Sequence, residues 1–106
     1  MANALIEVQT TFLSLDSQYV MLHAACKTDR DRAALAAKYA AAQKNYQTTL
    51  NQMLKDDDAQ VAALAKQLKA ANAAVNHATQ EMGDMSKVID GLAVAINLGS
   101  KLIACV

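Results

Sequence analysis

Apolar residues in the second half of the chain recur at alternating spacings of three and four residues over six heptads. The positions are Val61, Leu64, Leu68, Ala71, Val75, Ala78, Met82, Met85, Ile89, Leu92, Ile96, Gly99 and Ile103. Residues at this spacing share one stripe of a helix, which must be buried against other helices. The pattern keeps its phase across Gly83 and Asp84, and a glycine inside a helix costs only about 1 kcal/mol. The sequence therefore predicts one helix over residues 58–105, roughly 70 Å long at about 1.5 Å per residue.

Two shorter helices are predicted before it, over about residues 3–26 and 29–55. The first has its stripe at Leu5, Val8, Phe12, Leu15, Tyr19, Leu22 and Cys26. Further apolar residues at Ile6, Leu13, Val20 and Met21 widen that stripe. A stripe of this width favours packing against two neighbouring helices rather than one. The second helix has its stripe at Leu35, Tyr39, Ala42, Tyr46, Thr49 and Met53.

Polar residues mark both joints between these helices. Thr28, with Asp31 three residues later, resembles a capping box at the start of the second helix. Asp56, Asp57 and Asp58 follow that helix, and one of them is expected to cap the third, where negative charge suits the helix dipole. Both joints lack glycine and proline, so we expect short turns and antiparallel neighbours.

The predicted fold is therefore all-α, a single helical domain over residues 1–106 built as an antiparallel up-down-up bundle or coiled coil. Helices of about 25 residues are roughly 37 Å long and cover only the first half of the third helix. Residues 85–103 would then extend beyond the bundle with an uncovered apolar stripe. The alternative is a four-helix bundle in which the chain turns back at Gly83-Asp84.

Composition narrows the function classes. The chain has 106 residues, with ten basic and ten acidic residues that cancel, and no basic run, so we expect no nucleic-acid partner. The first residues lack a basic leader before an apolar stretch. We therefore expect a cytoplasmic protein, or one exported without a cleavable signal peptide. The apolar stretch after Val88 carries Asp90, Asn97 and Lys101, which argues against a membrane span.

Candidate chemistry is sparse. His77 and Glu81 lie one helical turn apart, but two ligands do not make a zinc site, and His23 belongs to another helix. The sequence has no Glu-x-x-His pair, phosphate loop or nucleophile–base arrangement. We therefore predict no enzyme, no catalytic residue, no cofactor, no metal site and no small-molecule substrate.

The remaining polar and cysteine positions give two further expectations. Asn72, Asn76 and Asn97 lie off the main stripe and are expected to face water, so no buried asparagine fixes the register of a coiled coil. Cys26 is expected in the core and Cys105 near a frayed helix end. Because a disulfide needs Cα atoms within about 7 Å, neither fold permits one between these two cysteines.

The uncovered stripe favours an interaction module that self-associates as a homo-oligomer or binds a partner helix. The predicted contact residues are Met85, Val88, Ile89, Leu92, Ala95, Ile96, Gly99, Leu102 and Ile103. The alanine-rich composition without proline or tryptophan resembles that of coiled-coil subunits, structural proteins and chaperone-like helical partners in bacterial secretion machines and phages. The alternative is a membrane-active amphipathic protein that uses residues 86–106, although few basic residues are available there to contact anionic lipid.

Overall fold

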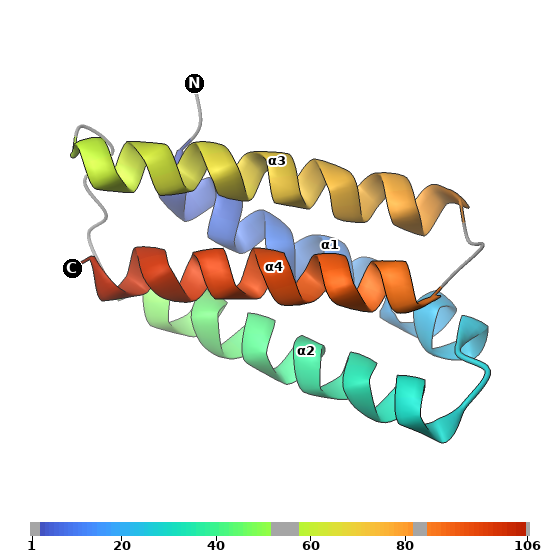
Figure 1. Ribbon diagram of the computed structural model, residues 1–106. Coiled ribbons are helices and arrows are strands. Elements are labelled where there is room, and N and C mark those ends of the chain that lie inside the picture. Colours follow the sequence, from blue (N-terminus) through green and yellow to red (C-terminus); the bar gives the residue numbers. More distant parts are fainter. Residues whose placement is uncertain (1–2, 52–57, 82–84, 106) are drawn as a thin grey trace.

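The described part of the chain folds as an all-α bundle, which confirms the predicted fold class. The computed structural model describes residues 3–51, 58–81 and 85–105 (Figure 1). These residues form four helices: α1 (Ala4–Ala25), α2 (Asp29–Thr49), α3 (Ala59–Glu81) and α4 (Met85–Ala104). The second helix ends at Thr49, earlier than predicted, and residues 52–57 lie outside the described residues.

The predicted continuous helix over residues 58–105 is wrong. The α3 helix ends at Glu81, and α4 begins at Met85 and packs back along α3 (Figure 1). The four-helix alternative is therefore the observed architecture, although Gly83-Asp84 itself lies outside the described residues. The physical reason is a match of lengths, since the four helices contain 22, 21, 23 and 20 residues. By turning back, α4 buries its apolar stripe within its own chain instead of leaving it in water.

The helices are arranged as two antiparallel hairpins, α1–α2 and α3–α4, that pack side by side. Around the bundle the order is α1, α2, α4, α3, so that α1 and α4 face each other across the core (Figure 1). In their described residues α2 and α3 lie on the other diagonal and make no contact. As a result, α1 has α2 on one side, α3 on the other and solvent behind it.

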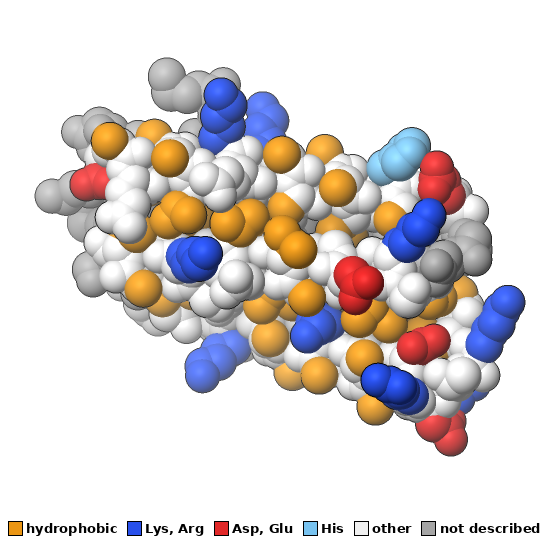
Figure 2. Space-filling model, in the orientation of Figure 1, with side chains coloured by type: hydrophobic (Ala, Val, Ile, Leu, Met, Phe, Trp, Pro, Cys, Tyr) orange, Lys and Arg blue, Asp and Glu red, His pale blue; other side chains and the backbone are white. Residues whose placement is uncertain are grey.

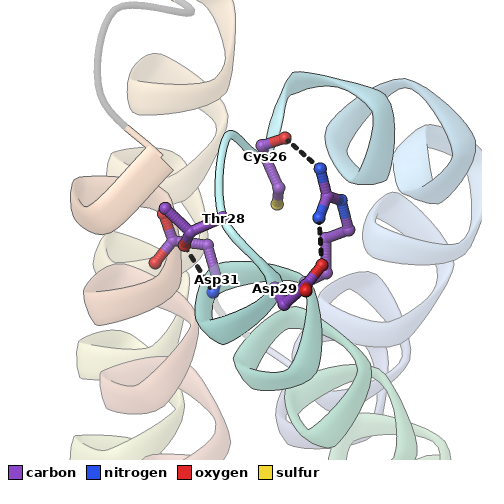
Figure 3. A network of polar contacts seen from close by, with 5 residues as sticks. Cys26, Thr28, Asp29 and Asp31 are labelled. Carbon is purple, nitrogen blue, oxygen red and sulfur yellow. Dashed lines mark hydrogen bonds and ion pairs between the residues drawn. The ribbon is translucent and has the colours of Figure 1, made fainter.

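Helix caps fix where the elements begin. The backbone N–H of Ile6 donates to the side chain of Asn3 at 3.1 Å, and that of Asp31 donates to Thr28 at 3.1 Å, which confirms the predicted cap (Figure 3). Asp58 Oδ1 accepts from the amides of residues 60 and 61 at 2.9 and 3.1 Å, so one aspartate of the predicted trio caps α3. In the α1–α2 turn, Arg32 binds the Asp29 carboxylate at 2.5 Å and donates to the carbonyl of Cys26 at 3.5 Å (Figure 3).

Among the described residues, the core consists of two clusters, one in each half of the bundle. One cluster joins α1, α3 and α4 near the N-terminal end of α1; its buried residues are Ala4, Val8, Val61, Ala65, Leu68, Ala95, Leu98 and Leu102. The other joins α1, α2 and α4 in the opposite half; its buried residues are Phe12, Leu15, Leu22, Cys26, Leu35, Ala42, Val88 and Leu92. Both clusters need α1 and α4, the two helices that face each other across the core.

Two glycines of α4 mark close approaches to other helices. A Cβ at Gly91 would lie 3.1 Å from Val75 Cγ2 on α3, and one at Gly99 would lie 3.3 Å from Asn45 Nδ2 on α2. Both distances are shorter than ordinary van der Waals contact. These two small residues of α4 therefore allow close packing inside the chain.

Candidate interaction surfaces

The residues predicted to bind a partner lie in the interior half of α4. Of the nine, Val88, Leu92, Ala95, Gly99 and Leu102 are buried, and the other four are half-buried. The buried positions pack on α1, α2 and α3, so the premise that this stripe is uncovered is wrong. The same packing covers the apolar arc on which the membrane-active alternative rested. What α4 presents to solvent is a mainly polar face with Lys87, Asp90 and Lys101, in which Val94 is the exposed large apolar residue.

A different helix exposes an apolar row. Ile6, Leu13 and Val20 of α1 are 55%, 50% and 83% exposed. Each lies two residues before a buried core residue of the same helix, in the pairs Ile6 and Val8, Leu13 and Leu15, and Val20 and Leu22. Two residues correspond to about 200° around a helix, so this row points directly away from the core. We call the row together with Thr10, Ser17 and Ala24, which lie between and beyond its members, the outer α1 stripe.

The sequence contains a signal for this stripe. Because the whole helix is rich in apolar residues, the sequence pattern predicts Ile6, Leu13 and Val20 as an extension of the core stripe. Their constant offset of two residues from Val8, Leu15 and Leu22 was the feature that separated the outward face from the inward one.

The polar groups of the outer α1 stripe are already hydrogen-bonded within α1. The hydroxyl of Thr10 donates to the carbonyl of Ile6 at 2.7 Å, and that of Ser17 donates to the carbonyl of Ser14 at 3.0 Å. A partner that covered these hydroxyls would leave no hydroxyl hydrogen without an acceptor, so the desolvation cost of covering the stripe is low.

The two carboxylates of α1 point sideways, toward the neighbouring helices. Glu7 Oε1 accepts from Asn72 Nδ2 of α3 at 3.2 Å, and Asp16 accepts from the Tyr39 hydroxyl of α2 at 2.5 Å. The other helices differ, since exposed lysines stand on α2, α3 and α4 at Lys44, Lys66 and Lys87. Figure 2 shows the face over α4, where charged side chains are scattered among apolar ones.

The seam between α1 and α3 is polar, which corrects the prediction for Asn72. Asn72 is only 8% exposed and accepts from the Thr11 hydroxyl at 2.7 Å. Its amide also donates to the carbonyl of Glu7 at 3.0 Å. The prediction failed because its partner Thr11 is 61 residues away in the sequence.

A small cleft lies beside this seam. It is lined by Thr10, Thr11, Ser14, Leu15, Gln18, Leu22, Asn72, Val75, Asn76, Thr79 and Leu92. Its space is about 10 Å³, which is no more than one water molecule needs. Thr79, which is 2% exposed, lines the cleft, and its hydroxyl has no hydrogen-bond partner in the part of the chain that the structure describes. The cleft is too small for an organic ligand.

Residues capable of chemistry are not gathered anywhere in residues 3–51, 58–81 and 85–105. No three of the described His, Cys, Asp and Glu side chains are placed to hold a metal ion together. His77 pairs with Glu81 at 3.1 Å on an exposed face, as the sequence predicted. Among the helices as described, none is both long and apolar enough to cross a membrane.

The cysteines lie at opposite ends of the bundle, since Cys26 follows α1 and Cys105 follows α4 (Figure 1). Both are free thiols, in agreement with the prediction that they cannot form a disulfide with each other. Burial raises the pKa of Cys26, the charge of Asp31 raises it further, and Arg32 partly offsets these effects.

Comparisons of this chain with protein-family models, with curated proteins and with solved structures give no match.

Proposed function

We propose that this chain is a non-enzymatic helical interaction module whose contact surface is the outer α1 stripe. The proposal keeps the class of function predicted from sequence and moves the surface from α4 to α1. The observation that carries it is the row Ile6, Leu13 and Val20, which is half to four-fifths exposed and lies along a line of α1 that contains no charged residue. Single exposed apolar residues are ordinary, whereas a row of them along one helix is typical of a binding surface.

The core packing of α1 does not depend on this row. The core face of α1 is already filled by Val8, Leu15 and Leu22, which are 1–2% exposed. Polar residues at positions 6, 13 and 20 would leave those contacts intact, so the fold does not require apolar residues there. A role in a secretion machine or a phage assembly stays a prediction from composition.

Site-specific photo-crosslinking in the source cells tests the proposal. A photoreactive amino acid is placed at Leu13, and in a second protein at Val94, which is 55% exposed on α4 and serves as a matched control. We expect a discrete crosslinked product from position 13 and none from position 94. Absence of a product at position 13, or equal products at both positions, would contradict the proposed surface.

A further inference from the structure

We infer that the partner covering the outer α1 stripe is a second copy of this chain, with α1 packed antiparallel against α1. This inference rests on the proposed function and adds the identity and orientation of the partner. It is drawn from two features of the stripe, the order of its large and small side chains and its lack of charge, and the area of the stripe sets the expected strength.

The outer α1 stripe has the spacing of a coiled-coil seam. Its members follow one another at alternating steps of four and three residues; in chain order they are Ile6, Thr10, Leu13, Ser17, Val20 and Ala24. This is the heptad spacing at which two helices pack along one line. Large and small side chains alternate strictly along it, with large apolar residues at 6, 13 and 20 and small ones at 10, 17 and 24.

An antiparallel pair places every large side chain opposite a small one. Consider two copies related by a two-fold axis that crosses the outer α1 stripe midway between positions 13 and 17. The facing pairs are then Ile6 with Ala24, Leu13 with Ser17, and Val20 with Thr10. All six layers then fall within α1 (Ala4–Ala25). A parallel pair would set large against large and small against small, which leaves gaps between the small layers, and such gaps forfeit packing energy. The side chains of α1 are therefore self-complementary in the antiparallel arrangement.

The absence of charge along the outer α1 stripe also favours a second copy of this chain as its partner. An uncharged stripe is best matched by another uncharged stripe, because a partner's charge would lose its hydration there without gaining a counter-ion. The outward faces of α2, α3 and α4 carry the exposed lysines Lys44, Lys66 and Lys87, whereas α1 contains no lysine or arginine. The outer α1 stripe of a second copy is uncharged along its whole length and therefore meets this requirement.

The area of the outer α1 stripe sets the expected affinity of the dimer. A stripe about 33 Å long and roughly 12 Å wide offers about 400 Å² per copy, which is half of a standard interface of about 800 Å² per partner. The dimer should therefore form reversibly at micromolar or higher concentration rather than as a permanent complex.

Sedimentation equilibrium of the full chain, up to about 0.5 mM, tests the inference. We expect a monomer–dimer equilibrium for the wild type. Leu13→Glu should weaken dimerisation at least about tenfold, because a lone buried charge is costly. Val94→Glu, at a similarly exposed site on α4, should leave dimerisation unchanged. Circular dichroism melts must first establish that both variants fold. A wild type that stays monomeric, or a Leu13→Glu protein that dimerises like the wild type, would overturn the inference.

Engineered cysteines test the orientation. In a Cys105→Ser background, with Cys26 left in the core, Leu13→Cys protein is mixed with Ser17→Cys protein under mild oxidation. The antiparallel pair places positions 13 and 17 opposite each other, so the mixed disulfide should form faster than either symmetric one. Faster crosslinking of Leu13→Cys with itself would indicate a parallel pair and refute the antiparallel orientation.

The photo-crosslinking experiment separates the two proposals. A product of twice the chain mass from position 13, containing only this protein, supports the second copy. A product containing a different protein overturns the second copy but leaves the proposed function standing. The absence of any product from position 13 removes both.

Discussion

The Thr11 hydroxyl and the Asn72 side chain are hydrogen-bonded to each other at 2.7 Å across the α1–α3 seam, although both residues are more than nine-tenths buried. The Asn72 amide also reaches the carbonyl of Glu7 at 3.0 Å. These contacts place a polar network in the seam between two parallel neighbouring helices. Such a network stabilises only the one alignment of α1 and α3 in which every member finds its partner.

Replacement of Asn72 tests the strength of this network. We expect Asn72→Ala to lower the free energy of unfolding by about 1–3 kcal/mol, since it leaves buried polar groups without partners. Thr11→Val should cost less, and the double variant should cost less than the sum of the two singles by about 0.5 kcal/mol or more. Urea denaturation of the four proteins measures this cycle. Strict additivity would show that the two side chains do not interact.

Thr79→Val should raise stability by about 1 kcal/mol, because it removes a buried hydroxyl without a hydrogen-bond partner and keeps the shape of the side chain. Thermal melts of the wild type and the variant measure the change. A fall in stability would mean that the hydroxyl is satisfied by solvent in the adjacent cleft.

Leu92→Ala tests whether α4 belongs to the core of the monomer. Leu92 is 2% exposed, so truncation should cost about 2–5 kcal/mol in unfolding free energy. Val94→Ala, two residues away and 55% exposed, should change stability by no more than about 0.5 kcal/mol. Denaturation at low protein concentration makes the comparison on the monomer. Equal, small effects would instead support a distal helix that protrudes from the bundle.

The Tyr39 hydroxyl should make stability depend on alkaline pH. Its hydrogen bond to Asp16 raises the pKa of Tyr39 above the usual value of 10.0, with desolvation and the Asp16 charge acting in the same direction. A raised folded-state pKa means that the stabilising contribution is fully present below the unfolded-state pKa and is lost as pH rises through the folded-state pKa. Tyr39→Phe should therefore lose part of the decline in stability that the wild type undergoes above about pH 10. Denaturant titrations at several alkaline pH values check this, and identical pH profiles would contradict it.

The two thiols should react at very different rates. Cys26 is buried, and burial raises its pKa, so the reactive thiolate is scarce, whereas Cys105 is half-buried at the end of α4. We expect iodoacetamide to modify Cys105 first and Cys26 only after denaturant is added, as read by mass spectrometry. Under mild oxidation, any disulfide should join Cys105 of two chains and disappear in Cys105→Ser. Equal labelling of both thiols in the native protein would contradict the burial of Cys26.

The sequence predicted the helical class, the beginning of each of the first two helices and the burial of Cys26. It failed at the turn after Glu81 for a physical reason. A 3-4 pattern indicates that a helix buries one stripe. The pattern is the same whether the chain continues as one helix or turns back and begins a second helix. A glycine inside a helix costs only about 1 kcal/mol, so a long unbroken pattern favours a helix that continues through Gly83. The larger contribution comes from the apolar area of Leu92, Ala95 and Leu102, which a protruding helix would leave in water and which the turn buries.

The choice of candidate contact surface depends on the same turn. If α4 is uncovered, Val88 and Leu102 are contact residues and the apolar residues of α1 belong to the core. In the packed bundle Leu13 and Leu15 lie on opposite faces of α1 and are 50% and 2% exposed. Asn72 could not have been placed from sequence at all, because its burial depends on where α1 and α3 align.

The division of the core into two clusters has a consequence for synthesis on the ribosome. Each cluster contains residues of both α1 and α4, so neither can be completed until α4 has been made. At about 5–20 residues per second, α4 follows α1 by several seconds, during which Phe12 and Leu35 have no α4 to cover them. The nascent chain thus holds an incomplete apolar core while three helices are already available. Molecular chaperones that recognise such exposed segments would meet this protein during translation rather than after it.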